Sequence, residues 1–134
     1  TLNADIWLYS EAGWTCNEFE DFEQGLKYLL EAEKLGRDDE WLNTEIGQCL
    51  GRLERYEEAI EILLKSRQIS LDEEDVVDGE DFELASCYVG IGDKENAQKY
   101  LDSARDSITE RGLLNDYFKE KIEEIEKGIF SLNN

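Results

Sequence analysis

The chain has 134 residues, of which 40% are hydrophobic and 36% charged, and it contains no proline and no histidine. Its 34 acidic and 14 basic residues give a formal net charge of -20, which argues against nucleic acid or an anionic membrane surface as a partner because both would be repelled. The apolar runs are too short to span a bilayer, so we expect one soluble domain over residues 1–134.

The sequence gives little support for a catalytic or metal site. Histidine, the commonest general base and metal ligand, is absent, and no glycine-rich phosphate-binding run occurs. Cys16, Cys49 and Cys87 are far apart and are predicted to be buried free thiols, which favours a reducing, cytoplasmic location. We therefore predict no enzymatic activity, no catalytic residue, no metal and no cofactor.

An internal repeat organises the chain. A shift of 34 residues places Trp7 on Trp41 and Gly13 on Gly47, and a further shift of 38 places Gly47 on Ala85. Within each copy, apolar residues recur at spacings of three and four in two successive segments, which predicts two amphipathic helices per copy. The repeats span residues of about 4–36, 38–70 and 77–109.

The predicted helices follow one another with short breaks. In chain order they span residues 4–18, 21–35, 39–53, 56–70, 79–91, 94–109 and 113–130. Gly36 can end the second helix, Asp38 and Asp39 can cap the third, and Asp93 can open the sixth after Gly92. Local end signals and apolar periodicity therefore agree.

Acidic residues are concentrated between the fourth and fifth helices. Residues 72–83 carry acidic side chains at eight positions without a lysine or arginine between them. The simplest interpretation is a solvated loop. A calcium loop is not expected, because its spacing would place Val76 and Ala85 at ligand positions.

The seventh predicted helix has one apolar face. Its apolar stripe consists of Leu114, Tyr117, Phe118, Ile122, Ile125 and Ile129. A stack of helical hairpins needs such a helix to cover its last exposed face, so residues 113–130 are predicted to be a C-terminal cap.

Seven positions in each copy follow a recognisable order of large and small residues. They are Tyr9, Ala12, Gly13, Cys16, Gly25, Leu29 and Ala32, then Asn43, Ile46, Gly47, Leu50, Ala59, Leu63 and Ser66, and then Asp81, Leu84, Ala85, Tyr88, Ala97, Leu101 and Ala104. This pattern resembles the tetratricopeptide repeat (TPR) family, and residues 35–41 look like linkers in bacterial multi-repeat members. The resemblance implies an all-α, right-handed superhelix of three hairpins plus the cap. Because no cap precedes the first helix, we expect a fragment of a longer protein.

The resemblance also implies that the first helix of each pair lines a concave groove that holds a protein or peptide. The predicted groove residues are Trp7, Ser10, Trp14, Asn17, Trp41, Thr44, Gln48, Phe82 and Ser86. This groove is aromatic and weakly charged, so basic or apolar segments are the expected ligands. The basic residues with which the best-known groove of the family clamps a carboxylate are missing here, and that ligand is not expected.

Several alternatives stay open at the level of sequence. Trp7 and Trp41 could face a partner or pack on a neighbouring helix, whereas Trp14 is expected to face a partner and Phe82 to pack. The repeats could instead act as a structural spacer or a self-association domain in a larger protein.

Overall fold

The computed structural model describes residues 2–132, with side chains from residue 3 onward, and all regular secondary structure in this range is helical. The helices are α1 (Leu2–Glu18), α2 (Phe22–Lys34), α3 (Glu40–Arg52), α4 (Tyr56–Asp72), α5 (Asp78–Gly90), α6 (Lys94–Glu110) and α7 (Asp116–Ser131). The predicted all-α class is confirmed. The first six helices agree with the predicted bounds to within two residues at each end. The seventh begins at residue 116 and not at 113, because Asn115 is its N-cap and accepts a hydrogen bond from the backbone N–H of Phe118.

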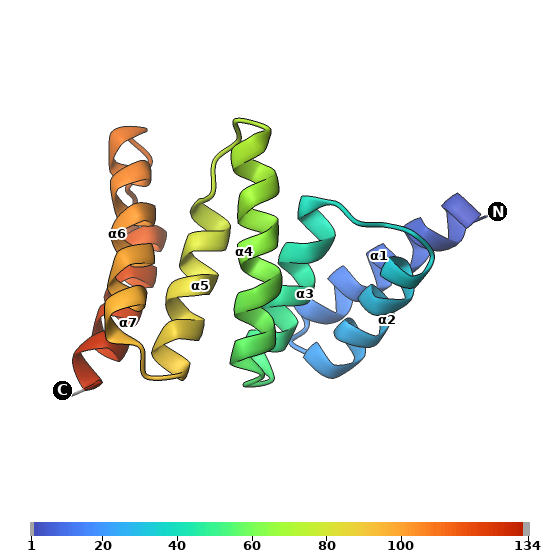
Figure 1. The fold of residues 1–134 in the computed structure, drawn as a ribbon, viewed down its shortest axis with the longest axis horizontal. Helices are drawn as coiled ribbons and strands as arrows, with labels where there is room; N and C mark the ends of the chain where they lie inside the picture. The colour runs from blue at the N-terminus through green and yellow to red at the C-terminus, as the bar shows by residue number, and fades with distance from the viewer. Residues whose placement is uncertain (1, 133–134) are drawn as a thin grey trace.

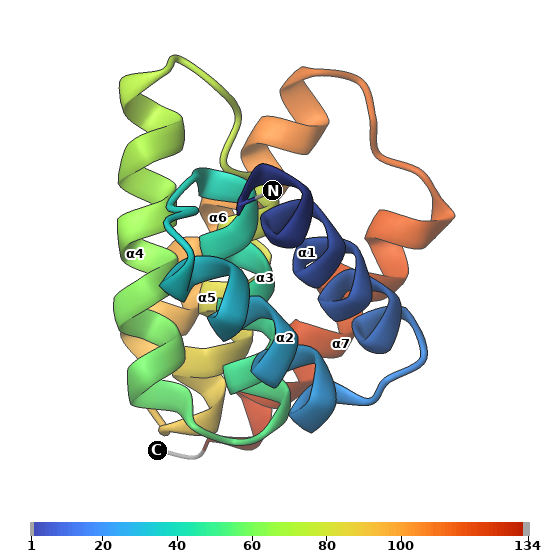
Figure 2. The same cartoon turned by 90° about the vertical axis from the view of Figure 1, so that its right-hand side faces the viewer.

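Successive helices form antiparallel pairs that stand side by side, from α1 and α2 at one end to α6 and α7 at the other (Figure 1). Figure 2 looks along this stack from the end that carries α1 and α2. The pairs approach closely at small residues, as predicted. A methyl group at Gly13 would lie 2.6 Å from Leu29 Cγ, and one at Gly47 would lie 2.5 Å from Leu63 Cγ. Both glycines therefore serve helix packing.

The ends of the helices use the predicted chemistry. Asp39 accepts a hydrogen bond from the backbone N–H of Leu42 at 2.9 Å, and Asp93 accepts one from that of Asn96 at 3.1 Å. Gly36 has a φ angle of 112°, a left-handed conformation that glycine adopts without steric cost. The breaks between helices are thus determined locally.

The second half of the acidic stretch is not a solvated loop, so that part of the interpretation is wrong. Asp81 is fully buried in α5, where its two carboxylate oxygens accept hydrogen bonds from Arg67 Nε and Ser103 Oγ, both at 2.6 Å. Glu80 is 4% exposed and accepts a hydrogen bond from Ser70 Oγ. These partners lie on α4 and α6, where sequence spacing could not connect them to the acidic run.

Helix α7 packs on both α5 and α6. Ile122, Ile125 and Ile129 are buried, and the ring of Phe118 stacks on that of Phe82 with centroids 6.1 Å apart. Two members of the predicted apolar stripe do not join this contact: Leu114 precedes the helix and is 40% exposed, and Tyr117 is 64% exposed. The cap is therefore shorter than the apolar pattern predicted.

Candidate partner-binding pocket

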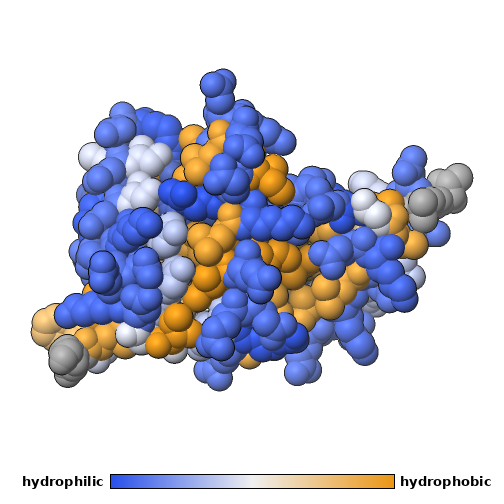
Figure 3. Space-filling model, in the orientation of Figure 1, coloured by the Kyte–Doolittle hydropathy of each residue, from blue (hydrophilic) through white to orange (hydrophobic). Residues whose placement is uncertain are grey.

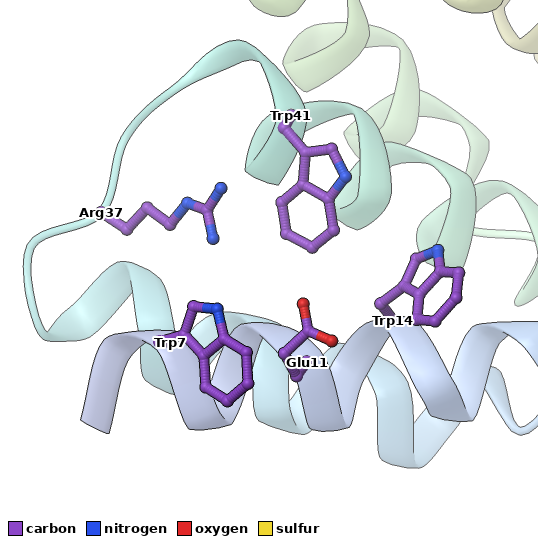
Figure 4. A pocket seen from close by; sticks show the side chains of 5 residues that line it. All are labelled: Trp7, Glu11, Trp14, Arg37 and Trp41. Atoms are coloured by element: carbon purple, nitrogen blue, oxygen red, sulfur yellow. The ribbon is translucent and has the colours of Figure 1, made fainter. Parts of the chain in front are cut away.

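Three tryptophans from two helices surround one hollow on the surface. The hollow has a volume of about 400 Å³ and is lined by Trp7, Glu11, Trp14, Arg37 and Trp41. In Figure 4, the side chains of Trp7, Glu11 and Trp14 extend from α1. Trp41 extends toward them from α3, and Arg37 from the linker between α2 and α3. We call this hollow the tryptophan pocket.

The spacing of residues along α1 determines which of them line the pocket. Trp7, Glu11 and Trp14 are separated by four and three residues, so they lie on one face of α1. That face turns away from α2, which α1 approaches through Gly13 on its other side. Trp7 is 60% exposed and Trp14 is 42% exposed, whereas Trp41 is half-buried. The aromatic surface is accessible in the free chain.

Arg37 is fixed in place by three contacts. Its guanidinium carbon lies 4.5 Å from the centroid of the Trp41 ring, its Nη1 donates to Ser10 Oγ at 2.7 Å, and its Nε donates to Asp39 Oδ2 at 2.9 Å. Ser10 Oγ in turn donates to the carbonyl of Ile6 at 2.7 Å. The arginine therefore forms one wall of the pocket and joins α1 to the start of α3.

The structure brings three of the nine predicted groove residues together at the tryptophan pocket. Trp7, Trp14 and Trp41 meet at the pocket, whereas Ser10, Asn17 and Phe82 are buried. Thr44, Gln48 and Ser86 are half-buried. The pocket thus contains the three tryptophans among the nine predicted groove residues, and the other six lie outside it.

Buried polar contacts hold α1 against α3 beneath the surface. Asn17 Nδ2 donates to Glu45 Oε1 at 3.1 Å, and Asn17 Oδ1 accepts from Cys49 Sγ at 2.9 Å. Gly25 of α2 makes room for this amide, because a methyl group there would collide with Asn17 Oδ1. Burial raises the pKa of Glu45 above its ordinary value. Asn17 therefore positions the two helices that carry the tryptophans.

Sequence reasoning missed two residues of the pocket, Glu11 and Arg37. Glu11 shares the helical face of Trp7 and Trp14, so the same spacing that selected the tryptophans could have selected it. Arg37 lies four residues before Trp41 in a linker. Nothing in its spacing shows that its side chain turns onto the indole ring.

Comparison with known proteins identifies the repeat. The tetratricopeptide repeat model matches residues 42–73 and 82–104, which lie within the helix pairs α3–α4 and α5–α6. These residues therefore contain two tetratricopeptide repeats. The comparison with curated proteins finds no match. The pair α1–α2 lies outside the matched residues, although it has the same close glycine contact as α3–α4.

A second hollow lies between α2 and α4. It has a volume of about 510 Å³ and contains the apolar side chains of Leu26, Leu30, Ile46, Leu50 and Ile62. Glutamates, an arginine and a lysine line its rim. Figure 3 shows an apolar strip on this face of the molecule, flanked by hydrophilic side chains. We call this hollow the apolar groove.

Two of the three cysteines are held as neutral thiols. Burial raises the pKa of both Cys49 and Cys87 to about 12, so each stays a neutral thiol at neutral pH, whereas nucleophilic cysteines need a lowered pKa. Within residues 2–132, no cluster of acidic and cysteine side chains could hold a metal ion. No helix in the same range is long and apolar enough to cross a membrane.

Proposed function

We propose that this TPR-containing chain binds a protein or peptide partner at the tryptophan pocket, with Trp7, Trp14 and Trp41 as anchors. TPR proteins act through protein–protein interaction, and the observation that carries the specific site is the meeting of three accessible tryptophans around one hollow. Tryptophan buries a large area with few rotatable bonds, and it is enriched among the residues that dominate binding energy at interfaces.

The charge of the chain supports a partner with basic or apolar segments. The net charge of -20 attracts cationic chains and repels acidic ones over the range of the Debye length. Arg37, the one basic residue that lines the pocket, is already paired with Asp39. An acidic partner would therefore gain little from it.

The test begins with selection of peptides from a random display library on the immobilised chain, which requires no assumption about the partner. The affinity of selected peptides should fall at least about thirtyfold in Trp14→Ala and Trp41→Ala, as expected for residues that dominate an interface. Phe130→Ala is the matched control, because Phe130 is an aromatic residue of α7 that is 84% exposed. Far-UV circular dichroism would verify that each variant is folded. Binders that tolerate both tryptophan substitutions would contradict the proposed site.

Self-association is the second candidate function, and exposed apolar residues away from the pocket favour it. Phe19 and Phe130 are 81% and 84% exposed, and the apolar groove runs between α2 and α4. Such surfaces often mark contacts between proteins. Sedimentation velocity over a wide concentration range would decide, since a monomer at every concentration would exclude self-association of this chain.

We also propose that the helices form one cooperative domain. One cluster of buried residues extends from Leu26 in α2 to Ile129 in α7, which is typical of stacked repeats that share a core. Urea unfolding monitored by circular dichroism and by tryptophan fluorescence should give coincident transitions. Earlier loss of the fluorescence signal would show that the α1–α3 end unfolds separately.

A further inference from the structure

The tryptophan pocket already contains one guanidinium group bound to an indole ring. Arg37 lies over Trp41 at 4.5 Å, a distance at which a cation is attracted by the negative face of the ring. The Trp7 and Trp14 rings flank the same space (Figure 4). They offer the same chemistry to a group that enters from outside.

A carboxylate stands between these two rings. Figure 4 shows the Glu11 side chain rising from α1 between Trp7 and Trp14, with its carboxylate directed toward the α3 side of the pocket. Among the residues that the structure describes, no lysine or arginine forms an ion pair with Glu11. The charge of Arg37 is compensated by Asp39. The pocket therefore has one anionic group without a cationic partner.

The other repeats show how a carboxylate at this position is used. The repeat shifts place Glu11 on Glu45 and Glu45 on Glu83. Glu45 accepts a hydrogen bond from Asn17, and both oxygens of Glu83 accept from the guanidinium of Arg52, at 3.3 and 3.4 Å. In both cases the donor belongs to the first helix of the preceding repeat. A hydrogen-bond donor therefore meets the equivalent carboxylate in both of the other repeats.

We propose that the tryptophan pocket binds an arginine side chain of the partner, with the guanidinium between the rings of Trp7 and Trp14 and paired with Glu11. This inference rests on the proposed function and names the chemistry of its ligand. A planar guanidinium can stack on indole and pair with a carboxylate through two parallel hydrogen bonds, whereas the compact ammonium of lysine is more strongly hydrated and does neither as well. A carboxylate ligand would meet Glu11 and Asp39 instead.

The direct test uses N-acetyl-arginine N-methylamide as the probe and the indole N–H resonances of the 15N-labelled chain as the readout. Saturable shifts are expected at Trp7 and Trp14, assigned through the single variants Trp7→Phe and Trp14→Phe. The citrulline analogue has the same shape without the charge and should bind about fivefold more weakly or worse, as for an exposed cation–π contact. Equal binding of arginine and citrulline would overturn the proposal, as would equal binding of the lysine analogue or stronger binding of the aspartate analogue.

Two variants that each remove one carboxylate charge test whether the arginine probe binds at Glu11. Glu11→Gln should weaken the arginine probe about fivefold and leave citrulline unchanged, because only the charged ligand loses an ionic partner. Glu95→Gln removes one charge from an exposed position of α6, at the other end of the stack (Figure 1), and should change neither. Equal weakening by both variants would mean that only the overall charge acts, which would overturn the assigned site.

The peptides obtained by display separate this inference from the proposed function. Tryptophan-dependent binders whose affinity is unchanged when each arginine is replaced by citrulline would refute the arginine pocket and leave the binding function intact. Absence of any tryptophan-dependent binder would refute the binding function itself. Loss of affinity on replacing one arginine, reproduced by Glu11→Gln, would support both.

Discussion

The two ends of the helical stack use aromatic residues in opposite ways. Around α1 and α3, three tryptophans stand around an open pocket. Around α5 and α7, Phe82 is 3% exposed, stacks on Phe118 and has Lys121 Nζ 5.5 Å from its ring centroid. The two sets occupy different positions of the repeat, because Phe82 is equivalent to Ser10 and Thr44 and not to a tryptophan. Ser10 is buried as well, so both this position and the cover that α7 provides account for the burial of Phe82.

The difference also depends on which residues each repeat carries at equivalent positions. Trp7 of the first repeat is equivalent to Trp41 in the second repeat and to Gly79 in the third. Trp14 is equivalent to Gln48 in the second repeat and to Ser86 in the third. The third repeat therefore lacks the rings needed for a second aromatic pocket. Under the proposed function, the α1–α3 end serves binding, whereas the aromatic rings at the α5–α7 end serve packing.

Truncation of the aromatic rings should separate the two ends most clearly. Phe82→Ala is expected to lower the free energy of unfolding by about 3–5 kcal/mol, because it leaves a cavity between α5 and α7. Trp14→Ala should lower it by less than about 1 kcal/mol, since the ring is 42% exposed. Urea unfolding monitored by far-UV circular dichroism measures both values. Similar losses would show that Trp14 also has a core role.

Removal of a single carboxylate should have the next largest effect. Asp81→Asn is expected to cost about 3 kcal/mol, because it leaves the partly buried guanidinium of Arg67 without its anionic partner. Glu126→Gln breaks the exposed pair with Arg105 and should cost no more than about 1 kcal/mol. The two variants remove the same charge, so equal unfolding free energies would show that burial does not matter here.

Addition of a methyl group should distinguish helix contacts from open positions. Gly47→Ala is expected to cost about 1–3 kcal/mol, because the new methyl group would press on Leu63. Gly79→Ala has no atom within 4 Å of the new group and should be neutral or stabilising by about 0.4–1 kcal/mol. Thermal unfolding of the two variants gives the comparison. Equal destabilisation would mean that the close contact with Leu63 is not the cause of the loss at Gly47.

The pH dependence of stability should contain a small contribution from Glu80. Burial, and then the charges of Glu40 and Asp81, raise the pKa of this carboxyl above its ordinary value, although the hydroxyl of Ser70 opposes the shift. As the pH falls from 7, the folded chain therefore takes up this proton before the unfolded chain does, and stability rises until the unfolded pKa of about 4.3 is passed. The ionised carboxylate is destabilising at neutral pH.

The variant Glu80→Gln isolates this contribution from that of the other carboxylates. It should be as stable as the parent chain or more stable at pH 7, by up to about 1 kcal/mol, and should gain less stability between pH 7 and 5. Urea unfolding at both pH values measures this change. A steeper gain in the variant would contradict the direction of the pKa shift.

Most of the helical framework was predictable because its signals are local. Apolar spacing, Asp39 and Asp93 as caps, and Gly36 as a terminator act within a few residues. The close contacts at Gly13 and Gly47 followed from the repeat. The late start of α7 was missed, because the apolar Leu114 extended the stripe into the preceding turn while Asn115 set the true start.

The candidate site was predictable in part. Spacing placed Trp7 and Trp14 on one face of α1, and the repeat placed Trp41 at an equivalent position. Spacing could not show that Ser10 accepts a hydrogen bond from Arg37, or that Asn17 of α1 donates one to Glu45 of α3. Such burial depends on which residue of another helix approaches, and in these cases that residue is 27 or 28 positions away.

The helices, their order and their repeat are specified by the amino-acid sequence alone, because helix formation, capping and hairpin packing depend on neighbouring residues and on a short period. Which polar and aromatic groups are buried depends instead on how the helices assemble. Asp81 is buried because Arg67 and Ser103 reach it from α4 and α6, and Phe82 because α7 covers it. Trp7 and Trp14 stay accessible because their face of α1 turns away from α2. The burial of these polar groups depends on contacts between distant segments, which the helical pattern of the sequence does not specify.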